Sequence, residues 1–440
     1  MTDLQEPETR EQPVDLATVR GVEASPQSRI LSSSSRSVER YFALLGYAGV
    51  CLVLLASLLE FVSWAIWSVE MGTVHPSEER AAEASQKASP VYEGVDWAKD
   101  FWREEALRKQ VPNVYVPFRL WSVTSWHGRY INNDAGPTGV WRRTLNPAHC
   151  DPGHALSAWT FGGSTMYGYG APDWATIPSY LSRELNAVSG NCVVVSNFGV
   201  EGYVSDQELI LLEEQLKAGG RPDIVVLYDG VNDSTLAWNP WGPPPAHFSA
   251  GTIQSRVEGS VSGRLDFLQK SYARRLAGAM LAHLRSRPSF APLISRSQPN
   301  VRRVVDNYEA NLRIAQALSR AYQFKLYCFW QPILIYGHKP FVPFEQHVVA
   351  ASTDGMSVDS ASFLVMRGVY QEAERRAEVN GDFVFLGNLF DATRDPIYMD
   401  VAHLGPEGNQ LAAKAIASRI RNRPQPASGA NEPPARRVRR

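Results

Sequence analysis

The stretch SAWTFGGST, residues 157–165, places a short apolar run directly before two glycines and a serine. Four more apolar runs follow along the chain: CVVVSNF at 192–198, DIVVLYD at 223–229, KLYCFW at 325–330 and FVFL at 383–386. Short runs rich in β-branched and aromatic residues, bounded by turn residues, are typical of buried strands. We therefore predict a sheet of five strands.

Longer segments with helical patterning separate these runs, at 174–185, 205–218, 304–322, 363–380 and 406–421. Strands that alternate with helices imply βαβ crossovers, because parallel neighbours need a long connection. The expected fold class is therefore α/β, a parallel sheet with helices on both faces. Residues 240–300 interrupt this rhythm, and we interpret them as an insertion that is either a lid or an ordinary surface helix packed on the sheet.

Outward from this region, toward the N-terminus, residues 41–59 read YFALLGYAGVCLVLLASLL without a charged residue, and apart from Glu60 the apolar character continues to Val69. At about 1.5 Å per residue, a helix of this length crosses a hydrocarbon core of roughly 30 Å. Some forty polar residues precede the segment, which is unlike a cleaved signal peptide. We predict an uncleaved transmembrane helix at 41–69, the alternative being a buried core helix.

Basic residues lie close to this apolar segment on its N-terminal side only. Five arginines precede it, and neither Lys nor Arg occurs between Tyr41 and Glu79. The positive-inside rule then places residues 1–40 in the cytoplasm and the rest of the chain outside the cytoplasmic membrane. A disulfide between Cys150 and Cys192 is chemically permissible there, although the sequence does not establish it. Cys51 lies in the span, and Cys328 is interpreted as a buried thiol.

The expected domain organisation has five parts. Residues 1–40 and 424–440 have the composition of disordered segments. The transmembrane helix at 41–69 is followed by a stalk or linker at 70–111, for which a helix and a loose chain both remain open. A catalytic domain occupies 112–423.

The overall charge is balanced, with 44 Lys and Arg against 45 Asp and Glu in 440 residues. This balance lacks the excess of positive charge by which nucleic-acid-binding proteins neutralise phosphates. We find neither a phosphate-binding glycine loop nor a metal-ligand spacing. We therefore expect no cofactor, no metal and no nucleic-acid partner, and the sequence leaves protein partners unknown.

Reactive residue types follow several of the expected strands. In an open parallel sheet, ligands bind beyond the carboxyl ends of the strands. Ser164 follows the first run and is placed to act as a nucleophile. It requires a base, because a serine alkoxide is not available at neutral pH. His403 is the candidate base, and Asp400 the residue that orients its ring.

The same strand ends supply donors for an oxyanion. The backbone amides of Ser164 and Gly199 and the side-chain amide of Asn232 are the candidates. Taken singly, Gly-Gly-Ser-Thr is a common turn, Asn-Asp a common helix cap and Asp-x-x-His a common surface pair. Their joint occurrence in this order favours a serine hydrolase site. The remaining histidines considered are interpreted as structural or exposed: His127, His154, His247 and His338.

These blocks resemble those of the SGNH hydrolases, also called the GDSL esterase and lipase superfamily, over about Trp141 to Ile420. The GGST form of the first block, with Gly163 where the GDSL form has Asp, resembles membrane-attached bacterial members, as does NYEANLRIAQAL (307–318) followed by FWQP (329–332). The resemblance implies a three-layer α/β/α flavodoxin-like sandwich of five parallel strands. It also implies Ser164, Asp400 and His403 as the triad and Ser164, Gly199 and Asn232 as the oxyanion hole.

Members of this superfamily include esterases, lipases, thioesterases and carbohydrate deacetylases. Because the catalytic domain is expected outside the membrane, we predict an acyl-ester hydrolase that removes acetyl or another short acyl group from a glycan. Tryptophans at 120–126 and 238–241 either stack on sugars or belong to the core. Two alternatives remain: an O-acyltransferase supplied with acyl groups through a membrane partner, and a non-catalytic envelope binding protein.

Overall fold

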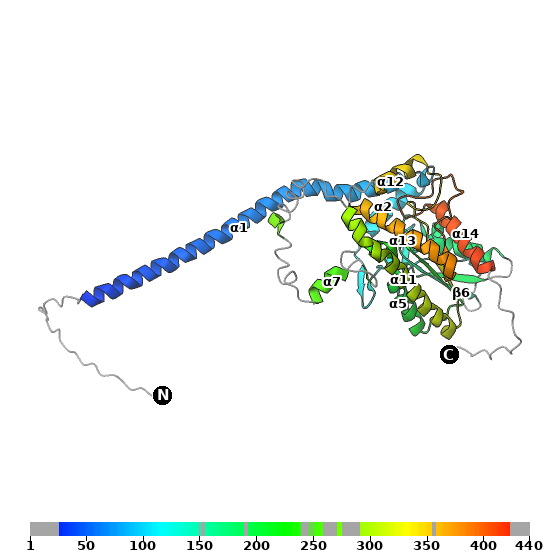
Figure 1. The fold of residues 1–440 in the computed structure, drawn as a ribbon, viewed down its shortest axis with the longest axis horizontal. Helices are drawn as coiled ribbons and strands as arrows, with labels where there is room; N and C mark the ends of the chain where they lie inside the picture. The colour runs from blue at the N-terminus through cyan, green and yellow to red at the C-terminus, as the bar shows by residue number, and fades with distance from the viewer. Residues whose placement is uncertain are drawn as a thin grey trace, which may run out of the picture.

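A long helix leads into an α/β body in the computed structural model (Figure 1). The structure describes residues 26–148, 150, 155–188, 192–238, 246–247, 250–257, 271–274, 291–353 and 358–422. Our expectations for residues 1–25, His154, Trp241, most of the 240–300 insertion and the tail from 424 onward lie outside the described residues.

The body is built on a five-stranded sheet in the order β10-β9-β8-β6-β7. All its strand pairs are parallel, which confirms the predicted α/β fold class. The strands span Leu156–Gly162 (β6), Val193–Asn197 (β7), Ile224–Asp229 (β8), Lys325–Trp330 (β9) and Val384–Phe385 (β10). After β7 the chain crosses to the other side of β6 to form β8. Strand order therefore reverses at β6. In open α/β sheets, ligands bind beyond the carboxyl ends of the strands at such a reversal point.

Helices cover both faces of the sheet because successive strand residues point to opposite sides. Trp159 and Phe161 of β6 pack into the core with α5 (Ser205–Lys217), α11 (Ala291–Tyr322) and α13 (Val358–Asn380). Ala158, which precedes Trp159, packs into the core on the opposite face with α4 (Ile177–Asn186) and α14 (Pro406–Asn422). The described part of the chain thus forms the predicted three-layer sandwich.

Helix α4 illustrates how local sequence sets an element boundary. Thr176 is extended, and its hydroxyl accepts a hydrogen bond from the Ser179 amide, which satisfies one of the free N–H groups of the first turn. Pro178 stands in that first turn, where a missing N–H costs no helical bond. The remaining short helical segments are α3 (Ser164–Tyr167), η2 (Asp173–Ala175), α6 (Val231–Thr235), η3 (Leu236–Trp238), α7 (Ala250–Val257) and α12 (Pro343–Thr353).

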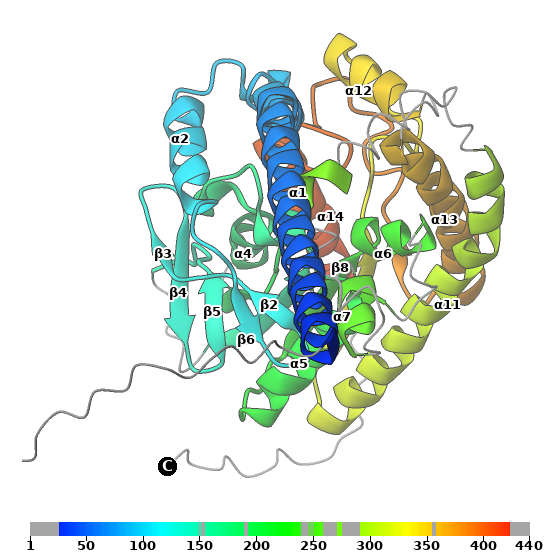
Figure 2. The same cartoon turned by 90° about the vertical axis from the view of Figure 1, so that its left-hand side faces the viewer.

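Several elements were not predicted. Residues 90–142 form η1 (Pro90–Tyr92), α2 (Ala98–Arg108), a hairpin of β1 (Val114–Val116) and β2 (Leu120–Ser122), and an antiparallel sheet of β3 (Trp126–His127), β4 (Asn132–Gly136) and β5 (Gly139–Arg142). Figure 2 shows α2 and this small sheet at one side of the body and α11 and α13 at the other.

The stalk expected at residues 70–111 ends well before residue 111. Phe101 and Trp102 of α2 are buried in an aromatic cluster with Tyr92, Tyr130 and Met399. Because these side chains remove large apolar surfaces from water, the chain from about Tyr92 onward is part of the body rather than a linker.

Two helices begin earlier than expected. Helix α1 runs from Pro26 to Lys87, so residues 26–40, which the composition suggested to be disordered, are helical. Helix α11 begins at Ala291 rather than 304 and contains Pro299. Proline normally ends or kinks a helix, which is why the sequence pattern favoured a later start.

Helix α1 contains one stretch long and apolar enough to cross a membrane, Arg40–Ile66. Its described side chains are almost all exposed, including Cys51, so the alternative of a buried core helix is not supported. Figure 1 shows this part of α1 extending away from the body.

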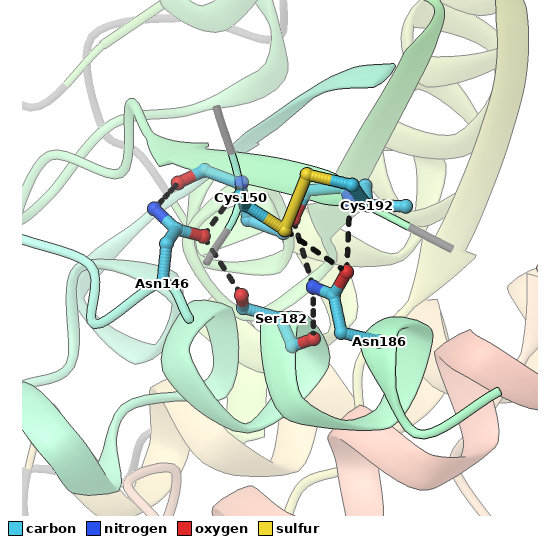
Figure 3. The surroundings of a disulfide bond; sticks show 7 residues. Asn146, Cys150, Ser182, Asn186 and Cys192 are labelled. Carbon is cyan, nitrogen blue, oxygen red and sulfur yellow. Dashed lines mark hydrogen bonds between the residues drawn. A yellow bond between two sulfur atoms is a disulfide. The ribbon is translucent and has the colours of Figure 1, made fainter. Parts of the chain in front are cut away.

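Cys150 and Cys192 are joined by a disulfide, with their Cα atoms 5.3 Å apart (Figure 3). The bond ties the segment after β5 to the start of β7 across a sequence separation of 42 residues. Side chains beneath it fix both segments: Asn146 donates to the Val195 carbonyl, and Asn186 donates to the Val193 carbonyl. Cys328, in contrast, is buried, as expected.

Candidate active site

The structure brings Ser164, His403 and Asp400 together at the carboxyl end of the sheet. Ser164 Oγ lies 2.7 Å from His403 Nε2, although 239 residues separate them. His403 Nδ1 lies 2.7 Å from Asp400 Oδ2. Nε2 faces the serine hydroxyl while Nδ1 faces a carboxylate. The ring is therefore oriented to accept a proton from Ser164 at Nε2 and to donate its Nδ1–H to Asp400.

Ser164 is placed by the turn between strand and helix. It is the first residue of α3, directly after Gly163, so its N–H has no acceptor within the helix. Asn197, at the end of β7, donates to the carbonyls of Met166 and Tyr167 and so fixes the C-terminal end of this one-turn helix. The turn that carries Ser164 is therefore held by contacts from the neighbouring strand.

The Asp400 carboxylate accepts hydrogen bonds on both oxygens. Oδ1 accepts from the backbone amides of Ala402 and His403, at 2.8 and 2.7 Å. Burial by itself would raise the pKa of Asp400, but the charge of His403 and these hydrogen bonds lower it below its ordinary value. Asp400 is therefore ionised over the whole neutral range.

The pKa of His403 moves in the opposite direction. Burial by itself would lower it, but the negative charge of Asp400 and the hydrogen bond to its carboxylate raise it above the ordinary value. Glu201 acts in the same sense. An anion beside an imidazole favours the imidazolium, and only the neutral ring can act as a base.

We expect kcat/KM for an ester substrate to rise with pH and to reach half its maximum above pH 6.5, the ordinary pKa of histidine. The sequence alone suggested a midpoint near 6.5 unless Asp400 shifted it, and the structure gives the direction of that shift. Initial rates between pH 5 and 9 measure it. In Asp400→Asn the midpoint falls and the rate drops, because the anion that favours imidazolium is gone. A flat profile, or a midpoint below 6.5, contradicts His403 as the base.

Asn232 lies beside the nucleophile at the start of α6. Its Nδ2 donates one hydrogen to the carbonyl oxygen of Tyr203, 2.7 Å away. A Cβ atom at Gly163 would collide with this same Nδ2, so the glycine before Ser164 is required by the close approach of Asn232. The primary amide carries two hydrogens, and the second remains for a substrate oxygen.

The structure does not support Gly199 as an oxyanion donor. Its N–H donates to Asn197 Oδ1 at 2.9 Å and is therefore already used. A Cβ atom at this position would collide with the backbone of Met166 and Tyr167. Gly199 is thus explained by close packing against α3, not by a contact with substrate.

Gly202, three residues further along the same turn, is a better candidate. Its φ is +79°, a conformation that favours glycine, and no backbone acceptor is found for its N–H among the described residues. It adjoins Tyr203, whose carbonyl oxygen holds Asn232. The candidate oxyanion donors in this structure are therefore Ser164, Gly202 and Asn232, with Gly202 in place of Gly199.

Buried carboxyl groups lie beneath the turns that carry Asn232 and Gly202. Asp233, next to Asn232, accepts from the Ser205 hydroxyl at 2.6 Å and so ties the start of α6 to the start of α5. Burial raises the pKa of Asp233 to about 6 and that of Asp229, at the end of β8, to about 8. In the described part of the chain, no group of three or more His, Cys, Asp and Glu side chains is arranged to hold a metal ion.

Polar residues that sequence reasoning missed surround the triad. Gln86 of α1 donates to Asp400, and the Tyr169 ring lies 4.7 Å from the His403 ring between centroids. Arg108 of α2 bonds Glu201, which precedes Gly202. Nothing in the local sequence marks Gln86 or Arg108, because both come from a segment that was expected to be a stalk.

The histidines and tryptophans considered as further candidates have structural or exposed positions. His127 and His338 are exposed beside Asp134 and Asp391. Trp121 and Trp238 are partly buried against the core rather than arranged as a platform for sugars.

Comparisons with known proteins give remote structural likenesses only. No family model matches the chain, and no curated protein matches it. Among solved structures, it is similar to a member of the lipolytic G-D-S-L family from Veillonella parvula, at 12% identity over 60% of this chain and 98% of that one, with a TM-score of 0.29. A putative acylhydrolase from Bacteroides fragilis matches at 12% identity over 62% and 89%, with a TM-score of 0.30.

An acetylxylan esterase from Geobacillus stearothermophilus matches at 15% identity over 60% of this chain and 94% of that one, with a TM-score of 0.29. Identity and TM-score are low in every case.

Proposed function

We propose that this protein is an SGNH-type serine esterase that hydrolyses short acyl esters through an acyl-serine intermediate. The observation that carries the proposal is the continuous relay from Ser164 through His403 to Asp400, with both contacts at 2.7 Å. Such a relay lets a neutral histidine take the serine proton while a buried carboxylate stabilises the imidazolium that forms.

The reaction follows from this arrangement. Ser164 Oγ attacks the ester carbonyl as His403 Nε2 accepts its proton. Negative charge develops on the carbonyl oxygen, where Ser164 N–H, Gly202 N–H and Asn232 Nδ2–H donate to it. The C–O bond breaks and the alcohol leaves with the proton from His403. A water molecule, deprotonated by His403, then releases the acid and restores the serine.

The surroundings of the triad favour a hydrophilic alcohol such as a sugar. Gln86, Lys109, Tyr169 and Glu201 are polar or charged and lie around His403 and the Gly202 turn. A long acyl chain needs an apolar channel, whereas hydroxyl-rich groups exchange their hydrogen bonds with water for bonds to such side chains. Acetyl or another short acyl group on a glycan is therefore the proposed substrate class.

We place this activity on the outer side of the cytoplasmic membrane. The apolar span Arg40–Ile66 supports an anchor, and the arginines before it support a cytoplasmic N-terminus. The Cys150–Cys192 disulfide supports the same side, because such bonds persist in oxidising compartments.

The test is acetate release from p-nitrophenyl acetate and from an acetylated oligosaccharide by the full chain in detergent, together with labelling by a serine-reactive fluorophosphonate. We expect release from both esters and labelling at Ser164. Preferential transfer of the acetyl group to an added unacetylated sugar, with little free acetate, points instead to an O-acyltransferase. A folded protein that neither releases acetate nor becomes labelled refutes the enzyme and leaves a binding protein.

A further inference from the structure

The last turn of helix α1 reaches the triad. Gln86, one residue before the end of this helix, donates from Nε2 to Asp400 Oδ2 at 2.8 Å. This is the same carboxylate oxygen that lies 2.7 Å from His403 Nδ1. A side chain from the helix that carries the apolar span is therefore in direct contact with the acid of the site, although 314 residues separate them in sequence.

The Gln86 amide is held on its other side as well. Tyr169 Oη donates to Gln86 Oε1 at 2.9 Å, and Lys109 Nζ donates to Tyr169 Oη at the same distance. With Oε1 occupied as an acceptor, Nε2 is the atom left to face Asp400, which as a carboxylate only accepts. The chain of hydrogen bonds runs from Lys109 through Tyr169 and Gln86 to Asp400.

The segment after Gln86 packs on the loop that carries Asp400 and His403. Ser89 Oγ donates to the Tyr398 carbonyl at 3.3 Å, and Tyr92 Oη lies 3.1 Å from Met399 Sδ. A Cβ atom at Gly405 would collide with the Val91 side chain. The end of α1 is thus fixed against the catalytic loop by contacts on both sides of Asp400 and is not a loose tether.

We propose that Gln86 is a positioning residue for the Asp400–His403 pair. Backbone amides fix Asp400 Oδ1, and Gln86 fixes Oδ2, so together they set the plane in which the carboxylate meets the imidazole. The helix that enters the membrane therefore completes the catalytic site, and activity depends on how its last turn docks. This inference rests on the proposed esterase function, since it concerns the same site.

The experiment compares the full chain, in detergent, with Gln86→Met, which keeps side-chain length but removes the amide. We expect kcat for p-nitrophenyl acetate to fall about ten-fold, as for loss of a hydrogen bond to a charged group, with KM little changed because Gln86 does not reach substrate. We also expect the acid limb of the pH profile to move to higher pH. With one donor fewer, Asp400 carries more negative charge density and favours the imidazolium more strongly.

Gln346→Met is the matched control. Gln346 is exposed on α12, where its Nε2 donates to the Phe341 carbonyl, so both kcat and the pH midpoint should stay at wild-type values. Rates are expressed per site titrated with the fluorophosphonate. A variant that is merely less stable loses titratable sites without a change in the midpoint, and an unchanged midpoint with unchanged kcat per site overturns the proposal.

The contact between Gln86 and Asp400 can still be tested if the protein is not an esterase. In that case no serine-dependent hydrolysis occurs in the wild type, and the pKa of His403 is read by NMR from ¹³C-labelled histidine, with His403→Gln identifying its resonance. A His403 pKa higher in Gln86→Met than in the wild type supports the contact as drawn. Equal values in the two proteins refute it, independently of any substrate.

Discussion

Ser164→Ala lowers kcat for ester hydrolysis by at least about 10⁴-fold, the size of the loss when a triad nucleophile is removed. The reason is chemical: without Oγ no acyl-enzyme forms, and only the oxyanion donors and substrate binding remain. Fluorophosphonate labelling is also lost in Ser164→Ala, because the reagent reacts with the same hydroxyl. The measurement is acetate release from p-nitrophenyl acetate with full-length protein at a pH above the His403 midpoint.

The fold survives this change. The hydroxyl of Ser164 has His403 as its hydrogen-bond partner, and the side chain is half-buried at the start of α3, so its loss leaves no apolar cavity. Ser418→Ala, on the exposed face of α14, is the matched control and keeps full activity. Equal melting temperatures for the three proteins separate chemistry from folding. Retention of activity in Ser164→Ala means that the nucleophile has been misplaced, and loss of folding means that Ser164 has a structural role.

The sheet, and the meeting of Ser164 with His403 and Asp400, could be predicted because short local patterns mark the strands and these residues. Each of the five strands is a short apolar run, and Ser164, Asn232 and the Asp400–His403 pair follow such runs or the turns after them. Parallel strands place their carboxyl ends at one edge, so residues distant in sequence meet there. The pairing of Ser164 with His403 follows from topology once the strands are known.

The second oxyanion donor could not be chosen in this way. Gly199 and Gly202 stand in the same turn after β7, and either spacing is compatible with a donor. Which glycine can donate depends on the direction of its backbone N–H. The Gly199 N–H donates to the Asn197 side chain, so it is not available to a substrate. A side chain folding back on its own loop competes with other uses of the backbone, and sequence spacing carries no record of it.

The contribution of residues 86–142 was missed for a different reason. Strands of two to five residues, such as β3 and β4, are too short to show an alternating pattern. Phe101 and Trp102 are apolar, but α2 also carries several charged residues, as expected of a solvated stalk. Only the tertiary structure shows that one face of α2 is buried and that Gln86 reaches Asp400.

Asn232→Ala is the second change with a large expected effect, a loss of about 3 kcal/mol of transition-state stabilisation, or roughly 100-fold to 1,000-fold in kcat. Asn232 Nδ2 donates one hydrogen to the Tyr203 carbonyl, and this bond fixes the direction of its second N–H. A donor held in place before the reaction stabilises the oxyanion without reorganisation, and it does so more strongly than it stabilises the neutral carbonyl of the substrate. KM should therefore change little while kcat falls.

A second variant tests the charge at this position. Asn232→Asp, like Asn232→Ala, loses the bond to the Tyr203 carbonyl, because a carboxylate only accepts hydrogen bonds. It keeps the shape of the side chain but places a negative charge where the oxyanion forms, so its kcat should fall at least as far as that of the alanine variant. Asn422→Ala, at the exposed end of α14, is the control and keeps wild-type kcat. Near-normal rates in both Asn232 variants remove this residue from the oxyanion hole, and Ser164 and Gly202 are then the only donors left for that role.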